Sequence, residues 1–197
     1  MSADATNVVD VFDSNVWVLA LTESSTKAEI LLEEILEDER TVAVSPYVFV
    51  EVLDAFAHEL DSREQVDGYQ TAFATIVADS SSIEGPAQDD IERADLDAVR
   101  DSGEATFIPR ILSIQAKDVL IVLSAWSYYD RDSTMFTADR SFATLDPERY
   151  GLERMSVEHV DPSTRRTENV REVPVPQTKR GRSPLSAAIA SRAFVTG

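Results

Sequence analysis

Four carboxylates lie where an apolar segment ends and a helix is expected to begin, or one turn into a helix. They are Asp13, Glu51, Asp118 and Asp139. In a parallel α/β sheet the carboxyl ends of the strands converge on one crevice, so we expect these side chains to be neighbours in space. Like charges gathered there would repel one another, and hard cations with oxygen ligands relieve that repulsion. The sequence therefore predicts one Mg²⁺ or Mn²⁺ site assembled by folding.

Each acid also has a purely structural explanation when it is taken alone. Asp13, Asp118 and Asp139 each precede a helical segment and could cap it, because Asp is a preferred capping residue. Glu51 could be a solvated position on an amphipathic helix. However, Glu51 interrupts an apolar run over 48–53, where a charge is costly unless it is paired or bound to a metal. The joint placement of the four acids favours the site.

The elements that must position these acids follow from the hydrophobic pattern. Strands alternating with helices predict an α/β fold with a central, parallel or mostly parallel sheet. The predicted strands cover 7–12, 41–44, 133–137 and 153–160. The predicted helices cover 26–37, 46–60, 65–78, 87–100, 118–126 and 140–145, with an irregular stretch at 101–115. The helix over 26–37 carries apolar residues at helical spacing: Ile30, Leu31, Ile35 and Leu36.

Composition limits the class of protein. The chain has 197 residues, of which 43% are hydrophobic, which suits one domain with some extra length. It has no cysteine, so thiolate metal sites and disulfides are excluded. The N-terminus lacks the basic and apolar regions of a secretory signal, and no apolar run reaches the length of a membrane span. We expect a soluble, cytoplasmic protein that makes no contact with a membrane.

The net charge of −18 looks unfavourable for contact with nucleic acid. Only three of the 18 basic residues are lysine, and the acids are spread along the body of the chain. Such an acid-rich, lysine-poor surface resembles that of proteins from a molar-salt cytoplasm. At about 1 M salt the Debye length falls to about 3 Å, so repulsion reaches little beyond contact. We interpret the acidity as a halophilic adaptation that does not exclude an RNA substrate.

The composition changes near the C-terminus. Residues 161–197 contain seven basic and three acidic residues, a net charge of +4, which leaves −22 for the preceding body. Four of the eight prolines lie in the same stretch, which has little hydrophobic periodicity. We predict a folded domain over 1–161, followed by a basic, proline-containing and flexible tail over 162–197.

With these motifs in place, the sequence resembles the PIN-domain ribonucleases, and among them the VapC-like toxins of toxin–antitoxin pairs. The resemblance covers about residues 7–160. It is carried by Asp13-Ser14, Glu51, Asp118 and the run Thr137-Ala-Asp-Arg-Ser-Phe142. It implies a PIN-like three-layer sandwich and an endoribonuclease in which Asp13, Glu51, Asp118 and Asp139 bind Mg²⁺ or Mn²⁺. Ser14 and Thr137 match positions that help to hold ligands or water. Residues 79–115 are long for a minimal toxin, and the basic tail is not part of the family's core.

The residues favour metal-dependent cleavage over other chemistry. Two divalent ions can activate water, neutralise phosphate charge and stabilise the leaving oxygen. A metal-free ribonuclease needs paired acid–base groups, usually histidines, and the chain has only His58 and His159, both expected to lie away from the chemistry. A haloacid-dehalogenase-like phosphatase needs a second Asp where this chain has Asn15.

The biological role and the partners are open to alternatives. The resemblance implies the toxin of a type II pair, with RNA as substrate, a small antitoxin as partner and a homodimer. We predict that the homodimer forms through apolar helix faces that include 26–37. An RNA-maturation nuclease and a non-catalytic PIN-like protein that binds a partner remain as alternatives. The second is disfavoured, because a dead site has no reason to keep unpaired buried charge.

Overall fold

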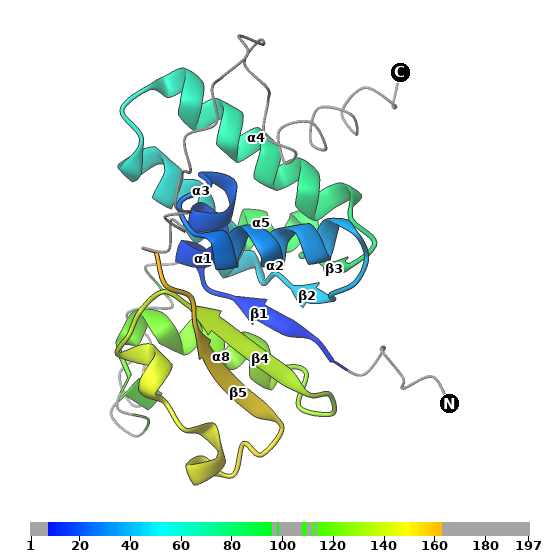
Figure 1. The fold of residues 1–197 in the computed structure, drawn as a ribbon, viewed down its shortest axis with the longest axis vertical. Helices are drawn as coiled ribbons and strands as arrows, with labels where there is room; N and C mark the ends of the chain where they lie inside the picture. Colours follow the sequence, from blue (N-terminus) through cyan, green and yellow to red (C-terminus); the bar gives the residue numbers. More distant parts are fainter. Residues whose placement is uncertain (1–7, 96–97, 99–107, 110–111, 113, 163–197) are drawn as a thin grey trace, which may run out of the picture.

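The computed structural model describes residues 8–95, 98, 108–109, 112 and 114–162. Figure 1 shows an α/β fold in which helices flank a five-stranded sheet. Every strand pairing is parallel, and the strand order is β3-β2-β1-β4-β5. The strands are β1 (Asp10–Phe12), β2 (Val42–Ala43), β3 (Ile83–Glu84), β4 (Ser133–Thr137) and β5 (Met155–His159). The predicted α/β fold with a parallel central sheet is confirmed.

The helices pack on this sheet and on one another. Helix α1 packs against α2 and α3, α3 packs against α4, and α8 packs against β1 and β4. In Figure 1 the helices α1 to α4 gather beside β1 and β2, whereas α8 lies with β4 and β5. The α-helices are α1 (Ser14–Leu21), α2 (Thr26–Leu36), α3 (Pro46–Glu59), α4 (Arg63–Asp79), α5 (Gln88–Arg93) and α8 (Val119–Trp126). The 3-10 turns are η2 (Ala116–Asp118), η3 (Phe142–Thr144) and η4 (Pro147–Tyr150). None of the described helices is long and apolar enough to span a membrane.

Local capping signals place the start of the helix that carries Glu51. Pro46 occupies the first turn of α3, where its missing N–H costs nothing. The Ser45 hydroxyl accepts a hydrogen bond from the Val48 N–H at 3.2 Å. Such a cap is preferred at helix starts because it satisfies a backbone donor that has no partner inside the helix. The predicted start of this helix is therefore confirmed.

Some predicted features differ from the structure. A fifth strand, β3, lies between the helices predicted over 65–78 and 87–100, where no strand was predicted. It has two residues, and its pairing depends on bonds to β2, such as Val42 N–H to Ser82 O at 2.9 Å. The helix predicted over 87–100 is interrupted: α5 ends at Arg93, Ala94 has an extended conformation, and Ala98 is again helical. The short helix predicted over 140–145 is the 3-10 turn η3. Most of the predicted irregular stretch at 101–115, and the tail from residue 163, lie outside the described residues.

The sheet also contains a buried charge that is separate from the four acids. Asp10 on β1 is 2% exposed and accepts a hydrogen bond from the Thr134 N–H of β4 at 3.1 Å. Arg40 forms an ion pair with Asp10, and its Nε also lies 2.7 Å from Glu34. Burial raises the pKa of the Asp10 carboxyl, although the charge of Arg40 and the hydrogen bonds oppose the rise. Arg40 is therefore the cation that makes an ionised Asp10 tolerable in the sheet.

Candidate active site

Asp13 follows β1 directly and stands at the start of α1, with 6% of its surface exposed. Its side chain makes no capping hydrogen bond to α1. Instead its Oδ2 accepts a hydrogen bond from the Thr137 hydroxyl at 2.8 Å, and its Oδ1 accepts one from the Ser14 hydroxyl at 3.3 Å. Thr137 is the last residue of β4, the neighbour of β1 in the sheet. The carboxylate is thus held between the ends of two adjacent strands and is not used as a helix cap.

Asp118 lies where the turn η2 continues into α8, and it is 2% exposed. Its Oδ2 accepts a hydrogen bond from the Gln115 N–H at 3.1 Å. Burial raises the pKa of the Asp118 carboxyl to about 6, although that hydrogen bond and the charge of Lys117 act in the opposite direction. Burial raises the pKa of Asp13 as well. Both carboxyls are costly to ionise where the fold places them.

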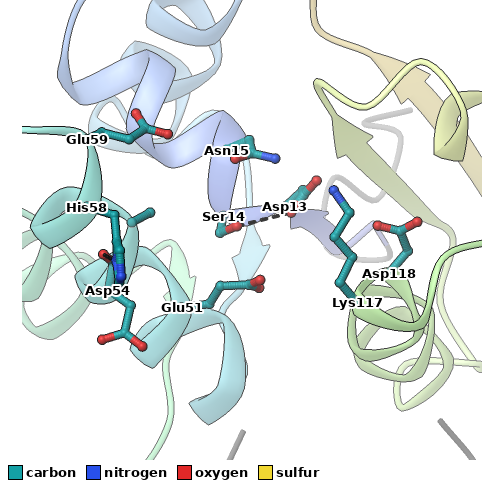
Figure 2. Close-up of a pocket in the computed structure, with 10 residues that line it drawn as sticks. Asp13, Ser14, Asn15, Glu51, Asp54, His58, Glu59, Lys117 and Asp118 are labelled. Atoms are coloured by element: carbon teal, nitrogen blue, oxygen red, sulfur yellow. Dashed lines mark hydrogen bonds between the residues drawn. The ribbon is translucent and has the colours of Figure 1, made fainter. Parts of the chain in front are cut away.

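Glu51 reaches the same region from α3 and is partly buried. The start of α3 is fixed by the Ser45 cap, and its middle is tied to α4 by a hydrogen bond from Gln70 Nε2 to the Leu53 carbonyl at 2.8 Å. Figure 2 shows Glu51 extending toward the region of Asp13, while Asp54 lies further along the same helix. The helix therefore presents one carboxylate to the centre of the site and a second at its edge.

Asp139 occupies a different position from the other three acids. Its Oδ1 accepts hydrogen bonds from the N–H groups of Ser141 at 2.7 Å and Phe142 at 3.3 Å, as in a capped turn. Its Oδ2 lies 3.2 Å from the Lys117 Nζ and accepts a hydrogen bond from Gln115 Nε2 at 3.1 Å. One oxygen thus fits the capping interpretation of this residue, and the other faces the site through Lys117.

The Thr137 hydroxyl joins two of these acids. It donates to Asp13 and accepts a hydrogen bond from the Asp139 N–H at 3.0 Å. The side chain is fully buried. Its hydroxyl therefore fixes the Asp13 carboxylate relative to the backbone of the loop that carries Asp139.

A pocket of about 360 Å³ opens over these residues (Figure 2). Five carboxylates and a single ammonium, that of Lys117, are among the ten side chains that line it. The lining residues are Asp13, Ser14, Asn15, Glu51, Asp54, Ala55, His58, Glu59, Lys117 and Asp118. Three of the four predicted acids therefore share one pocket, and Asp139 is outside its lining.

Sequence reasoning gave no role to Lys117, which stands in the middle of this arrangement. In Figure 2 its ammonium lies between Asp13 and Asp118. Partial burial lowers its pKa, but the hydrogen bond to Asp139 and the charges of Asp118 and Asp13 outweigh this and leave the pKa raised. Two signals in the sequence could have singled it out: it directly precedes Asp118, and it is one of only three lysines in the chain.

The chemistry of the side chains fits a divalent cation. Carboxylate oxygens are the ligands that Mg²⁺ and Mn²⁺ prefer, and a cation would stabilise the ionised forms of Asp13 and Asp118 that burial disfavours. The distances between these side chains do not match a bound ion, because no three acids or histidines among the described residues are close enough to hold one ion together. Lys117 supplies the positive charge in this arrangement. The role of the four acids as metal ligands therefore stays a prediction.

The two histidines do not form an acid–base pair at the pocket. His58 lies in the pocket wall, with its Nδ1 2.7 Å from the Asp54 carbonyl one turn earlier in α3. His159 is at the end of β5, where its Nε2 lies 3.3 Å from the Ala138 carbonyl, and it is not part of the pocket lining. The carboxylates and Lys117 are therefore the main charged groups available for chemistry.

Comparisons with known proteins found similarity among solved structures. No protein-family model matches the chain, and no curated protein matches it. Among solved structures, the chain is similar to one described as VapBC2 from Rickettsia felis bound to a DNA fragment from their promoter. The sequence identity is 17% and the TM-score is 0.43, over 78% of this chain and 99% of the other.

Proposed function

We propose that this protein is a divalent-metal-dependent nuclease that hydrolyses RNA phosphodiester bonds in the pocket at the ends of β1 and β4. The observation that carries the proposal is the convergence of Asp13, Glu51 and Asp118 on one pocket from three distant parts of the chain. Two of these carboxyls are nearly inaccessible to solvent and have raised pKa values. A fold places charge in such positions at a cost in stability, which is expected where the charge has a chemical role.

The roles of the side chains follow from their positions around the pocket. Asp13, Glu51 and Asp118 would hold the cation after moving closer together, since no three acids among the described residues are near enough as they stand, and Asp139 would act from the edge of the site. When bound, the cation would supply the charge needed to activate water and to neutralise phosphate. Thr137 orients Asp13 through the 2.8 Å hydrogen bond and thereby keeps one carboxylate oxygen at a fixed place. Ser14 supports the other oxygen of the same group.

The proposal is tested by cleavage of a fluorescently labelled RNA in Mn²⁺, in Mg²⁺ and in EDTA. The Asp13→Asn and Asp118→Asn variants are expected to lose cleavage by at least a hundredfold while keeping the circular dichroism of the wild type. Asp132→Asn is a matched control, because Asp132 is an exposed acid paired with Arg154 at 2.9 Å outside the pocket. Full cleavage in EDTA, or by Asp13→Asn, would refute the metal-dependent mechanism.

We further propose that the nuclease is the toxin of a type II toxin–antitoxin pair, as the sequence resemblance implies. The acidic pocket supports this role, because an inhibitor could block it by presenting a cation or by covering its entrance. The test is co-expression with the small open reading frame beside its gene, followed by co-purification and an RNA cleavage assay. A wild-type protein that cleaves RNA but forms no such complex would favour an RNA-maturation nuclease. Folded protein without Mn²⁺ binding or cleavage would favour the non-catalytic alternative.

The homodimer also stays a proposal. If it forms through α2, the exposure of that helix's apolar side chains indicates which of them would make the contact. Helix α2 buries most of its apolar side chains within the domain: Ala28, Leu31, Leu32 and Ile35. Ile30, in contrast, is 48% exposed. If α2 takes part in a dimer, Ile30 must be a central contact, and Ile30→Glu is expected to halve the mass measured by light scattering. An unchanged dimer mass in this variant would place the interface elsewhere.

A further inference from the structure

Lys117 is the only cationic side chain among the ten that line the acidic pocket. Its Nζ lies 3.2 Å from Asp139 Oδ2, and it also interacts electrostatically with Asp118 and Asp13. One ammonium therefore faces three of the four predicted acids, two of which would hold the cation. The side chain is 41% exposed, so it is accessible from solvent and has room to move.

The contacts of Asp139 show how the ammonium is held. The Oδ1 of Asp139 is engaged by the backbone of the following turn, which leaves Oδ2 to Lys117 and Gln115. Gln115 also donates its backbone N–H to Asp118, so the segment 115–118 connects both carboxylates. The position of Lys117 is thus set by the same short segment that supplies Asp118.

We propose that Lys117 is an internal counter-cation that competes with the divalent ion for the pocket carboxylates and so weakens metal binding. This inference rests on the proposed function, because it assumes that the pocket takes a divalent ion. The ammonium neutralises part of the carboxylate charge when no metal is present. A divalent ion entering the pocket must displace it or tolerate a positive neighbour, and both cost free energy.

Two consequences follow that a purely structural lysine would not produce. Removing the charge is expected to tighten divalent binding, because the competitor is gone. The same change is expected to destabilise the metal-free protein, because Asp139, Asp118 and Asp13 then repel one another without a counter-charge. Affinity and metal-free stability therefore change in opposite directions.

The experiment uses Mn²⁺ as the probe and measures its dissociation constant by isothermal titration calorimetry, with melting temperatures in EDTA and in saturating Mn²⁺. For Lys117→Met we expect Mn²⁺ to bind roughly three- to tenfold more tightly, the range that a half-exposed ion pair allows. This variant is also expected to melt below the wild type in EDTA and to gain more from Mn²⁺. Lys117→Arg keeps the charge and is expected to bind Mn²⁺ with an affinity close to that of the wild type.

Lys27→Met is the matched control. Lys27 is 37% exposed and lies 2.5 Å from Glu158 in a comparable ion pair, but it does not line the pocket. We expect Lys27→Met to leave the Mn²⁺ affinity unchanged. If Lys117→Met does not fold, Lys117→Gln provides a neutral side chain that remains polar, and the same comparison applies to it.

The outcomes separate this inference from the proposed function. Equal Mn²⁺ affinities of the wild type and of Lys117→Met would overturn the role of Lys117 but would not contradict the proposed metal site. Lys117→Arg binding as tightly as Lys117→Met would also overturn it, because charge would then not be the cause. An absence of Mn²⁺ binding in the wild type and in every variant would overturn both proposals.

Discussion

Replacing Asp118 by Asn is expected to stabilise the metal-free protein at neutral pH, although it removes a proposed metal ligand. Burial raises the pKa of Asp118 from 3.8 to about 6. A shift of about two units corresponds to about 3 kcal/mol at a pH well above 6, since each unit is worth about 1.4 kcal/mol. The amide oxygen of the Asp118→Asn variant could still accept the Gln115 hydrogen bond, but the neutral side chain would lose the attraction of Lys117. The pKa of about 6 already includes the attraction of Lys117, so we expect a net gain of at least about 2 kcal/mol in the free energy of unfolding.

The pH dependence of this gain has a definite sign. Because the folded pKa is raised, the folded state holds a proton between about pH 4 and 6 that the unfolded state has already lost. Ionisation of Asp118 therefore lowers the stability of the wild type as pH rises through this window, and the neutral variant lacks this contribution. The difference between the two proteins should be small near pH 4 and complete near pH 7.

The assay is a series of thermal melts from pH 4 to 7.5 in EDTA, read by circular dichroism. A gain of about 2 kcal/mol corresponds to a melting temperature higher by about 4–8 °C in a domain of this size. The exposed control Asp132→Asn should stay within about 1 °C of the wild type, as surface substitutions usually do. A melting difference that is the same at pH 4.5 and 7.5, or a less stable Asp118→Asn at pH 7.5, would refute the reasoning.

Three further predictions address the surroundings of the site and the rest of the chain. Arg40→Met leaves Asp10 buried without its cation and is expected to lower the free energy of unfolding, measured in urea, by about 2–4 kcal/mol. An unchanged midpoint of the urea transition would mean that Asp10 is neutral in the fold. Thr137→Val removes the 2.8 Å hydrogen bond to Asp13 and should lower RNA cleavage at least tenfold with the fold kept; unchanged cleavage would show that Asp13 needs no such support. If the acidic surface is a halophilic adaptation, the melting temperature should rise as KCl increases toward molar concentration, and deletion of 162–197 should leave it unchanged. A melting temperature that falls steadily with KCl, or a truncated protein that does not fold, would contradict the respective interpretation.

The parts of the site that could be predicted are those fixed by local rules. The strand-end rule placed Asp13, which follows β1 directly, and the apolar run that forms α8 marked Asp118 at the start of that helix. The Ser45-Pro46 pair gave the start of α3, and the register of that helix then placed Glu51. In these cases the residues that flank each acid determine which element carries it and where in that element it lies.

The parts that could not be predicted depend on residues far away in the chain. Strand β3 has two residues, and only its bonds to β2 make it a strand. Ile30 fits the apolar pattern of α2 but is 48% exposed, because other apolar residues of that helix make its contacts with the rest of the domain. The position of Lys117 depends on Asp139, which follows a different element, so no local pattern could reveal their ion pair.

The hydrogen bond between Thr137 and Asp13 also has a consequence for synthesis of the protein. It joins residues that are 124 positions apart, so Asp13 is synthesised long before Thr137, its hydrogen-bond partner. A nascent chain that ends before β4 carries Asp13, Glu51 and Asp118 but lacks the strand that orients Asp13. If the protein is the nuclease proposed, we expect prematurely terminated products to be inactive, so that only a chain translated past β4 could cut RNA.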